Sequence, residues 1–208
     1  VIEAVKHAAW AVGAKADIQW LNAEEYEKNP KALRQLSKLG GIIVPGGFGS
    51  RGVEGKIAAI RYAREHAIPY FGLCYGMQLA VVEFARSIAN LKNASTTEVN
   101  PKTPHPVIAT MAEQEKNIAE GKFGGSMRLG TQPCELVPGT VSARAYNERT
   151  ITERHRHRYE LNNQYREELE RAGLTVAGIN PERNLVEIIE LKKHPFFVGT
   201  QFHPELKS

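Results

Sequence analysis

The chain has 208 residues, of which 42% are hydrophobic and 24% charged, and this is enough to bury one substantial core. Its net charge of +4 includes no block of like charges, which argues against a nucleic-acid-binding arm. Cysteine occurs only at Cys74 and Cys134, which excludes a secreted disulfide scaffold, and no apolar run is long enough to span a membrane, so we expect the reducing cytoplasm.

The first half of the chain alternates helical and strand patterns. Apolar spacing predicts helices over residues 2–12, 30–36, 53–66 and 77–85 and strands over residues 16–21, 42–44 and 68–73. This β-α-β-α order is typical of a parallel sheet with helices on both faces.

The second half is richer in strands. Short strand-like pieces are predicted at residues 127–129, 141–145, 185–189 and 196–202, with one helix over residues 163–172 that ends at Gly173. Residues 112–126 are polar and contain glycines, so we expect a mobile lid there. The fold class predicted is α/β, with a mainly parallel central sheet flanked by helices and additional antiparallel strands in the second half.

Cys74 lies between a predicted strand and a predicted helix, with Gly72 and Gly76 on either side. A nucleophile on such a turn is held in an exposed, strained conformation, as in the Gly-x-Ser-x-Gly elbow. A helix N-terminus after the thiol favours the thiolate. A free cysteine is more often a small buried hydrophobe, and we keep that interpretation for Cys134.

His203 and Glu205 could complete a catalytic set with Cys74. His203 follows the apolar strand predicted at residues 196–202, which would hold it at a strand end, and Glu205 could orient the ring. The tripeptide His203-Pro204-Glu205 is a weak signal alone, but together with the cysteine turn it indicates a cysteine-nucleophile enzyme.

Chemistry alone does not decide the function of two further segments. The glycine-rich residues 45–49 lack the features of a P-loop or a dinucleotide fingerprint, and they could form an oxyanion hole or an ordinary tight turn. The basic residues 153–160 could be a solvated face or a nucleic-acid contact. Alternation places Arg154, Arg156 and Arg158 on one side, where one of them could clamp a substrate carboxylate.

Several segments resemble the class I (triad-type) glutamine amidotransferases, which have a flavodoxin-like fold. The cysteine turn at residues 72–78 and the His-Pro-Glu tripeptide are shared across that family. Residues 45–52, 125–130 and 153–160 narrow the resemblance to the C-terminal glutaminase domains of the CTP synthase family. The likeness covers nearly the whole chain in the same order.

The resemblance implies the role of each site residue. Cys74 would attack the side-chain amide carbon of glutamine, His203 would move protons, and Glu205 would orient His203. Backbone amides near Gly47 and Tyr75 would hold the oxyanion. The implied glutamine-binding residues are Gly47, Phe48, Tyr75, Gly76, Met77, Gln78, Glu98 and Arg158, with no metal ligand. Arg158 would pair with the α-carboxylate of glutamine and Glu98 with its ammonium.

The resemblance also implies partners outside this chain. In the family, ammonia passes to an amidoligase domain, where ATP and Mg activate UTP for amination to CTP, and GTP is the usual activator. We expect no cofactor in residues 1–208 themselves, L-glutamine as substrate, and no nucleic-acid or membrane partner. By resemblance the intact enzyme is a homo-oligomer, a tetramer, and residues 112–126 resemble the lid near the GTP effector.

The chain departs from the family pattern at several points. Tyr75 stands where Leu is common, and Ser126 replaces a frequent Thr. We expect residues 1–208 to be a glutaminase domain trimmed at its N-terminal strand and C-terminal tail, with the amidoligase domain absent. The alternatives are a free-standing γ-glutamyl hydrolase of the same fold and a catalytically silent binding module, and the intact Cys-His-Glu set argues against the second.

Overall fold

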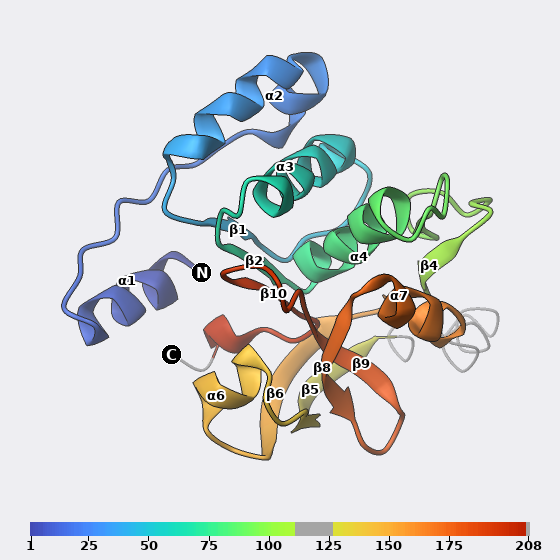
Figure 1. Ribbon diagram of the computed structural model, residues 1–208. Coiled ribbons are helices and arrows are strands. Elements are labelled where there is room, and N and C mark those ends of the chain that lie inside the picture. The colour runs from blue at the N-terminus through green and yellow to red at the C-terminus, as the bar shows by residue number, and fades with distance from the viewer. Residues whose placement is uncertain (111–126, 207–208) are drawn as a thin grey trace.

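A curled seven-stranded sheet forms the centre of the molecule, which is described here from a computed structural model covering residues 1–110 and 127–206 (Figure 1). The strands run in the order β1 (Ile42–Val44), β2 (Tyr70–Leu73), β10 (Phe197–Thr200), β9 (Leu185–Glu190), β8 (Thr175–Asn180), β5 (Arg128–Leu136) and β6 (Thr150–His157). The first three are parallel, and every later pair is antiparallel. This confirms the predicted α/β fold and its antiparallel second half.

Helices pack on both faces of this sheet. The α-helices are α1 (Ile2–Ala11), α2 (Ala23–Lys28), α3 (Val53–Glu65), α4 (Tyr75–Ser87), α6 (Val141–Tyr146) and α7 (Arg166–Ala172). The 3-10 helices are η1 (Pro30–Lys38), η3 (Asn163–Tyr165) and η4 (Pro204–Leu206). Side chains of α3, α4 and α7 share one apolar core, and those of α6 join a second core on the opposite face. The helices predicted around residues 2–12, 53–66, 77–85 and 163–172 are therefore confirmed.

A small second sheet lies beside the large one. It contains β3 (Ser95–Thr96), β4 (Pro106–Ala109) and β7 (Glu160–Leu161), with β4 between the other two strands. β7 follows β6 almost directly, so the chain passes from the large sheet to the small one through Arg158 and Tyr159.

Two predicted strands are wrong. Residues 16–21 form no strand: β1 lies at the edge of the sheet and pairs only with β2 among the described residues, so this segment has no strand partner. An unpaired extended segment is not stable as a strand. Residues 141–145 form α6 instead, since Thr140 caps the helix by accepting from the Ala143 amide and Glu190 accepts from the Val141 amide.

The lid predicted at residues 112–126 lies outside the described residues. None of the helices in the described part of the chain has the length and apolarity that crossing a bilayer requires.

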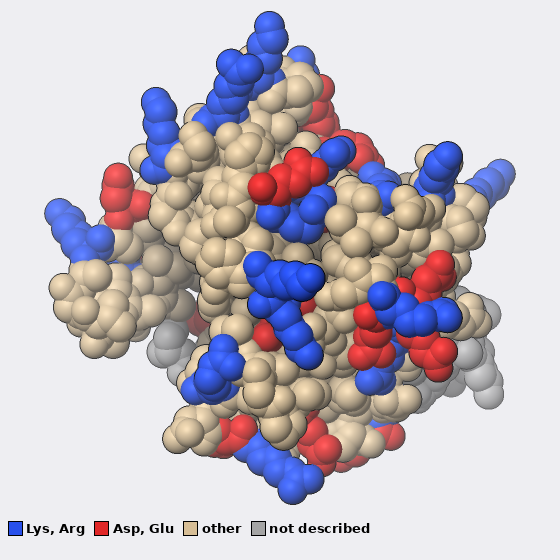
Figure 2. Space-filling model, in the orientation of Figure 1, with Lys and Arg blue, Asp and Glu red and all other residues tan. Residues whose placement is uncertain are grey.

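On the face drawn in Figure 2, basic and acidic side chains lie interspersed.

The parallel strands bring two distant parts of the chain together. β2 and β10 are neighbours, with Leu73 opposite Thr200, and the Cys74 amide donates to the Thr200 carbonyl at 2.6 Å. Both strands end at the same edge of the sheet. Cys74 and His203, which follow these two strands, are therefore delivered to one place.

Candidate active site

Cys74 occupies a strained turn between β2 and α4. Its φ of 50° and ψ of −99° lie in a region that residues with a Cβ rarely adopt. A Cβ added to Gly76 would overlap the Val44 carbonyl oxygen, and one added to Gly72 would lie 2.7 Å from the Gly76 carbonyl carbon. Both glycines are therefore required because the first turn of α4 packs directly against neighbouring backbone. The predicted strained turn is confirmed, but the predicted exposure is wrong, since Cys74 is only 4% exposed.

His203 and Glu205 form a bonded pair beside this turn. His203 Nδ1 lies 2.8 Å from Glu205 Oε1, and the His203 amide donates to the Arg154 carbonyl. With Nδ1 donating to the carboxylate, Nε2 is free to accept a proton. A Cβ on Gly46 would lie 3.6 Å from His203 Nε2 and 3.7 Å from Cys74 Cβ, so both side chains border the same point.

Burial controls the protonation of the thiol. Desolvation raises the pKa of Cys74 to about 12, although the Tyr75 amide opposes the rise by hydrogen bonding. The amide at the start of α4 thus favours the thiolate as expected, but burial has the larger effect and the pKa rises. Burial also acts to raise the pKa of Glu205, but the hydrogen bond from His203, a backbone hydrogen bond and the nearby positive charge together outweigh it, and the pKa of Glu205 is lowered. The site holds a neutral thiol beside an imidazole backed by a carboxylate.

A cavity of about 610 Å³ opens onto Cys74 and His203. Five of the predicted glutamine-binding residues line it, namely Gly47, Phe48, Gln78, Glu98 and Arg158. Arg158 Nε is buried and has no hydrogen-bond partner among the described residues. Phe48 is 87% exposed at the cavity mouth. The lining of the cavity thus includes the thiol, a carboxylate and a guanidinium whose Nε has no partner in the described part of the chain.

The glycine-rich loop at residues 45–49 is tied down over this cavity. The Gly49 amide donates to Glu98 Oε1 at 2.9 Å, and the Tyr75 hydroxyl donates to the Gly49 carbonyl. The Tyr75 ring lies against Gly47. These bonds give the loop a defined shape beside Cys74, as an oxyanion hole would need.

Three predicted residues do not line the cavity. The Met77 side chain is fully buried in the core and packs against Gly199, Gly76 lies against Val44, and the Tyr75 side chain supports the loop. Their predicted contact with glutamine can come only from their backbone.

Four other residues line the cavity outside the predicted glutamine-binding set: Met127, Arg156, His157 and Tyr159. Of these, only Arg156 was considered for the site, as one of three possible carboxylate clamps. The alternation of residues 150–157 is real, with exposed Arg154 and Arg156 on one face and buried His155 and His157 on the other. That alternation could have indicated inward-facing histidines. The position of Tyr159 depends on the junction between the two sheets, for which the sequence carries no local signal.

No group of three or more His, Cys, Asp and Glu side chains in the described residues is arranged to hold a metal ion. Cys74 and Cys134 are both free and buried.

The family described as Glutamine amidotransferase class-I matches the chain over residues 1–208. The chain belongs to this family. It is 57% identical to a CTP synthase from Caldanaerobacter subterraneus subsp. tengcongensis and 56% identical to one from Carboxydothermus hydrogenoformans, in each case over 100% of this chain. It spans 38% of the length of each of these relatives, so it corresponds to one part of a longer enzyme.

Solved structures agree with the family. The glutaminase domain of the Trypanosoma brucei CTP synthase, with bound acivicin, matches with a TM-score of 0.90 and 37% identity, covering 99% of this chain and 79% of that one. A putative GMP synthase subunit from Thermoplasma acidophilum matches with a TM-score of 0.58 at 16% identity, covering 98% of this chain and 78% of that one, which shows a shared fold only. Within the family, the chain therefore matches the glutaminase domains of CTP synthases.

The raised pKa of Cys74 predicts how the resting thiol reacts. Alkylation of Cys74 by iodoacetamide without glutamine should be slow at neutral pH and should keep rising beyond about pH 10, because only the thiolate reacts and its fraction stays small below a pKa of about 12. Peptide mass spectrometry after timed labelling measures the rate. Cys134, which is buried outside the cavity, serves as the internal control and should stay unlabelled while the protein is folded. A labelling rate that levels off below about pH 8 would contradict the neutral resting thiol.

Proposed function

We propose that the chain is the glutaminase domain of a CTP synthase and hydrolyses the side-chain amide of L-glutamine to supply ammonia. The observation that carries the proposal is the shared cavity, which is lined by the thiol of Cys74, the Glu205-backed imidazole of His203 and the guanidinium of Arg158, whose buried Nε has no partner among residues 1–110 and 127–206. A thiol and an imidazole suit acyl transfer, and the guanidinium suits a substrate that carries a carboxylate.

The proposed chemistry begins from the neutral thiol. His203 Nε2 takes the Cys74 proton as sulfur attacks the amide carbon, and the carbonyl oxygen becomes an oxyanion held by backbone amides near Gly47 and Tyr75. Return of the proton to the amide nitrogen breaks the carbon–nitrogen bond and releases ammonia, leaving a γ-glutamyl thioester. His203 then removes a proton from water, which attacks the thioester. Glutamate leaves and the Cys74 thiol is restored.

Glutamine recognition is proposed to rest on two charged side chains. Arg158 offers the guanidinium to the α-carboxylate, and Glu98 offers its carboxylate to the ammonium while it also accepts from the Gly49 amide. The contact between Glu98 and Gly49 would couple ammonium binding to the loop over the oxyanion. Gly76 and Met77 are proposed to contribute only backbone, as Tyr75 does.

The wider assignment follows the relatives, of which this chain spans only part. We propose that the ammonia passes to an amidoligase domain that uses ATP, Mg and UTP, that GTP activates the reaction, and that the intact enzyme is a tetramer. The two unpaired cysteines fit a reducing compartment, and the cytoplasm is the proposed location.

Replacing the nucleophile tests the division of labour. In a full-length enzyme that contains this chain, Cys74→Ala should abolish glutamine-dependent CTP formation, because no other group in the cavity can form the thioester. Ammonia-dependent CTP formation should be unchanged. Both rates are measured as CTP formed with glutamine or with an ammonium salt. Loss of both activities in a folded variant, or retention of both, would overturn the proposed function.

Replacing the guanidinium tests the recognition step. Arg158→Ala should raise the KM for glutamine by roughly ten- to a hundredfold, because one charge-assisted pair contributes about 1.5–3 kcal/mol. Steady-state glutamine hydrolysis measures the effect. Arg154→Ala is the matched control, since Arg154 is exposed on the neighbouring strand and does not line the cavity. An equal KM in the two variants would remove Arg158 from the glutamine site.

A further inference from the structure

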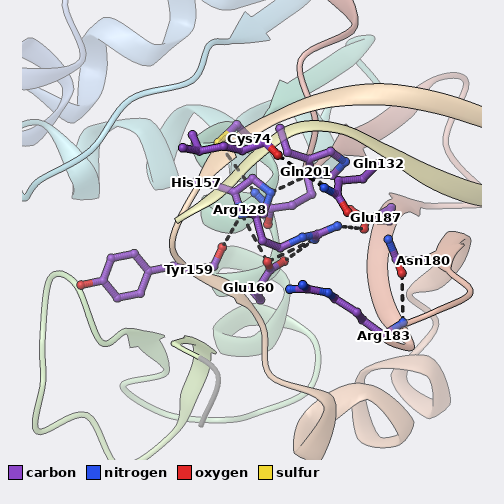
Figure 3. Close-up of polar contacts among 12 residues, drawn as sticks. Cys74, Arg128, Gln132, His157, Tyr159, Glu160, Asn180, Arg183, Glu187 and Gln201 are labelled. Atoms are coloured by element: carbon purple, nitrogen blue, oxygen red, sulfur yellow. Dashed lines mark hydrogen bonds and ion pairs between the residues drawn. The ribbon is translucent and has the colours of Figure 1, made fainter. Parts of the chain in front are cut away.

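A cluster of buried charged and titratable side chains lies behind the wall of the cavity (Figure 3). Its members are Arg128, His155, His157, Glu160 and Glu187, and each is at most 5% exposed. His157 also lines the cavity beside Cys74, whereas the other four lie deeper. We call these five residues the Arg128 cluster.

Arg128 joins the two sheets. One guanidinium nitrogen donates to Glu160 Oε1 on β7 at 3.1 Å, and another donates to Glu187 Oε1 on β9 at 2.7 Å. Glu187 belongs to the large sheet and Glu160 to the small one. Arg128 itself pairs in register with His157, the last residue of β6. The guanidinium therefore fixes the separation between the end of β6 and the start of β7.

The chain between those two ends is Arg158–Tyr159, and both residues line the cavity. The Tyr159 carbonyl accepts from Gln78 Nε2 at 2.9 Å, and Gln78 Nε2 also contacts Gln201 Oε1 at 3.3 Å. Gln201 Nε2 lies 3.7 Å from Cys74 Sγ. A movement at the start of β7 would thus act directly on Arg158, whereas it would reach Cys74 only through the Tyr159 carbonyl and two amide side chains.

Stability alone is a weak reason for such a cluster. Burying ions costs desolvation energy that ion pairing only partly offsets, and apolar replacements are often as stable. Here some buried atoms, Arg128 Nε and His155 Nε2 among them, have no partner within the described structure. A buried polar network that leaves some atoms without partners is more simply explained by its holding the neighbouring cavity residues in place.

The two histidines of the cluster are not suited to proton transfer at Cys74. Burial, with the positive charge of Arg128 in addition, lowers the pKa of His155 to about 3, and burial together with His155 and Arg128 holds the pKa of His157 well below its usual range. Both rings stay neutral at the pH at which enzymes work.

We infer that Arg128, through Glu160 and Glu187, is a positioning residue that sets the place of Arg158 and Tyr159 for glutamine recognition. This inference rests on the proposed function. It assigns Arg128 to substrate binding rather than to the chemical step, which Cys74 and His203 carry out from other strands.

The test compares KM and kcat for glutamine hydrolysis in a full-length enzyme that contains this chain. Arg128→Met should raise the KM for glutamine at least tenfold while kcat changes less than threefold, because binding is lost and the thiol and imidazole remain in place. Arg64→Met is the matched control. Arg64, whose side chain is 14% exposed, pairs with the fully buried Glu83 at 2.8 Å, between α3 and α4 and away from the cavity lining. It should lower the melting temperature without changing KM.

Arg128→Lys provides a second variant in case the methionine protein does not fold. A single ammonium cannot reproduce the fork that holds two carboxylates, so KM should rise at least threefold with kcat retained. The inference is overturned if a folded Arg128 variant has the wild-type KM, loses kcat instead, or behaves as Arg64→Met does. Absence of glutamine hydrolysis in the wild-type enzyme would instead overturn the proposed function, so the two failures are distinguishable.

Discussion

The strained backbone of Cys74 is the constraint on which the rest of the site depends. Its positive φ turns the chain sharply from β2 into α4, and the turn closes only because Gly72 and Gly76 carry no Cβ where neighbouring backbone lies. Such strain persists where the surrounding structure holds it. Here the holding elements are β1, which touches Gly76, and β10, whose Thr200 carbonyl accepts from the Cys74 amide.

The same strands that hold the cysteine also bring its partners. Because β10 lies parallel to β2, its C-terminal end carries His203 to the edge where Cys74 lies, and η4 then turns Glu205 back onto the imidazole. Burial raises the pKa of the Cys74 thiol, and His203, whose ring is bonded to Glu205 and lines the same cavity, is the neighbouring group placed to take its proton. The side of the cavity proposed to recognise the substrate is formed by the residues between β6 and β7, where the Arg128 cluster joins the two sheets.

Local sequence patterns predicted the features that depend on residues close together in the sequence. The glycines around Cys74 and the strand before His203 were sufficient for the turn and the dyad, and Gly173, with a φ of 112°, ended its helix as expected. Residues 16–21 were misassigned because a strand needs a partner, and residues 141–145 because Glu190, 49 positions from Val141, stabilises a helix there. The sequence did not predict that His157 and Tyr159 line the cavity, because their positions depend on how the large and small sheets lie together.

The central claim is that Cys74 is the nucleophile that attacks glutamine, and covalent labelling tests it most directly. A full-length enzyme that contains this chain is treated with an electrophilic analogue of glutamine and then mapped by peptide mass spectrometry. If Cys74 is the nucleophile, we expect a single label, on Cys74 and not on Cys134, and we expect it to form more slowly when glutamine is present. Inhibition of glutamine hydrolysis with Cys74 unlabelled, or with the label on another residue, would contradict it.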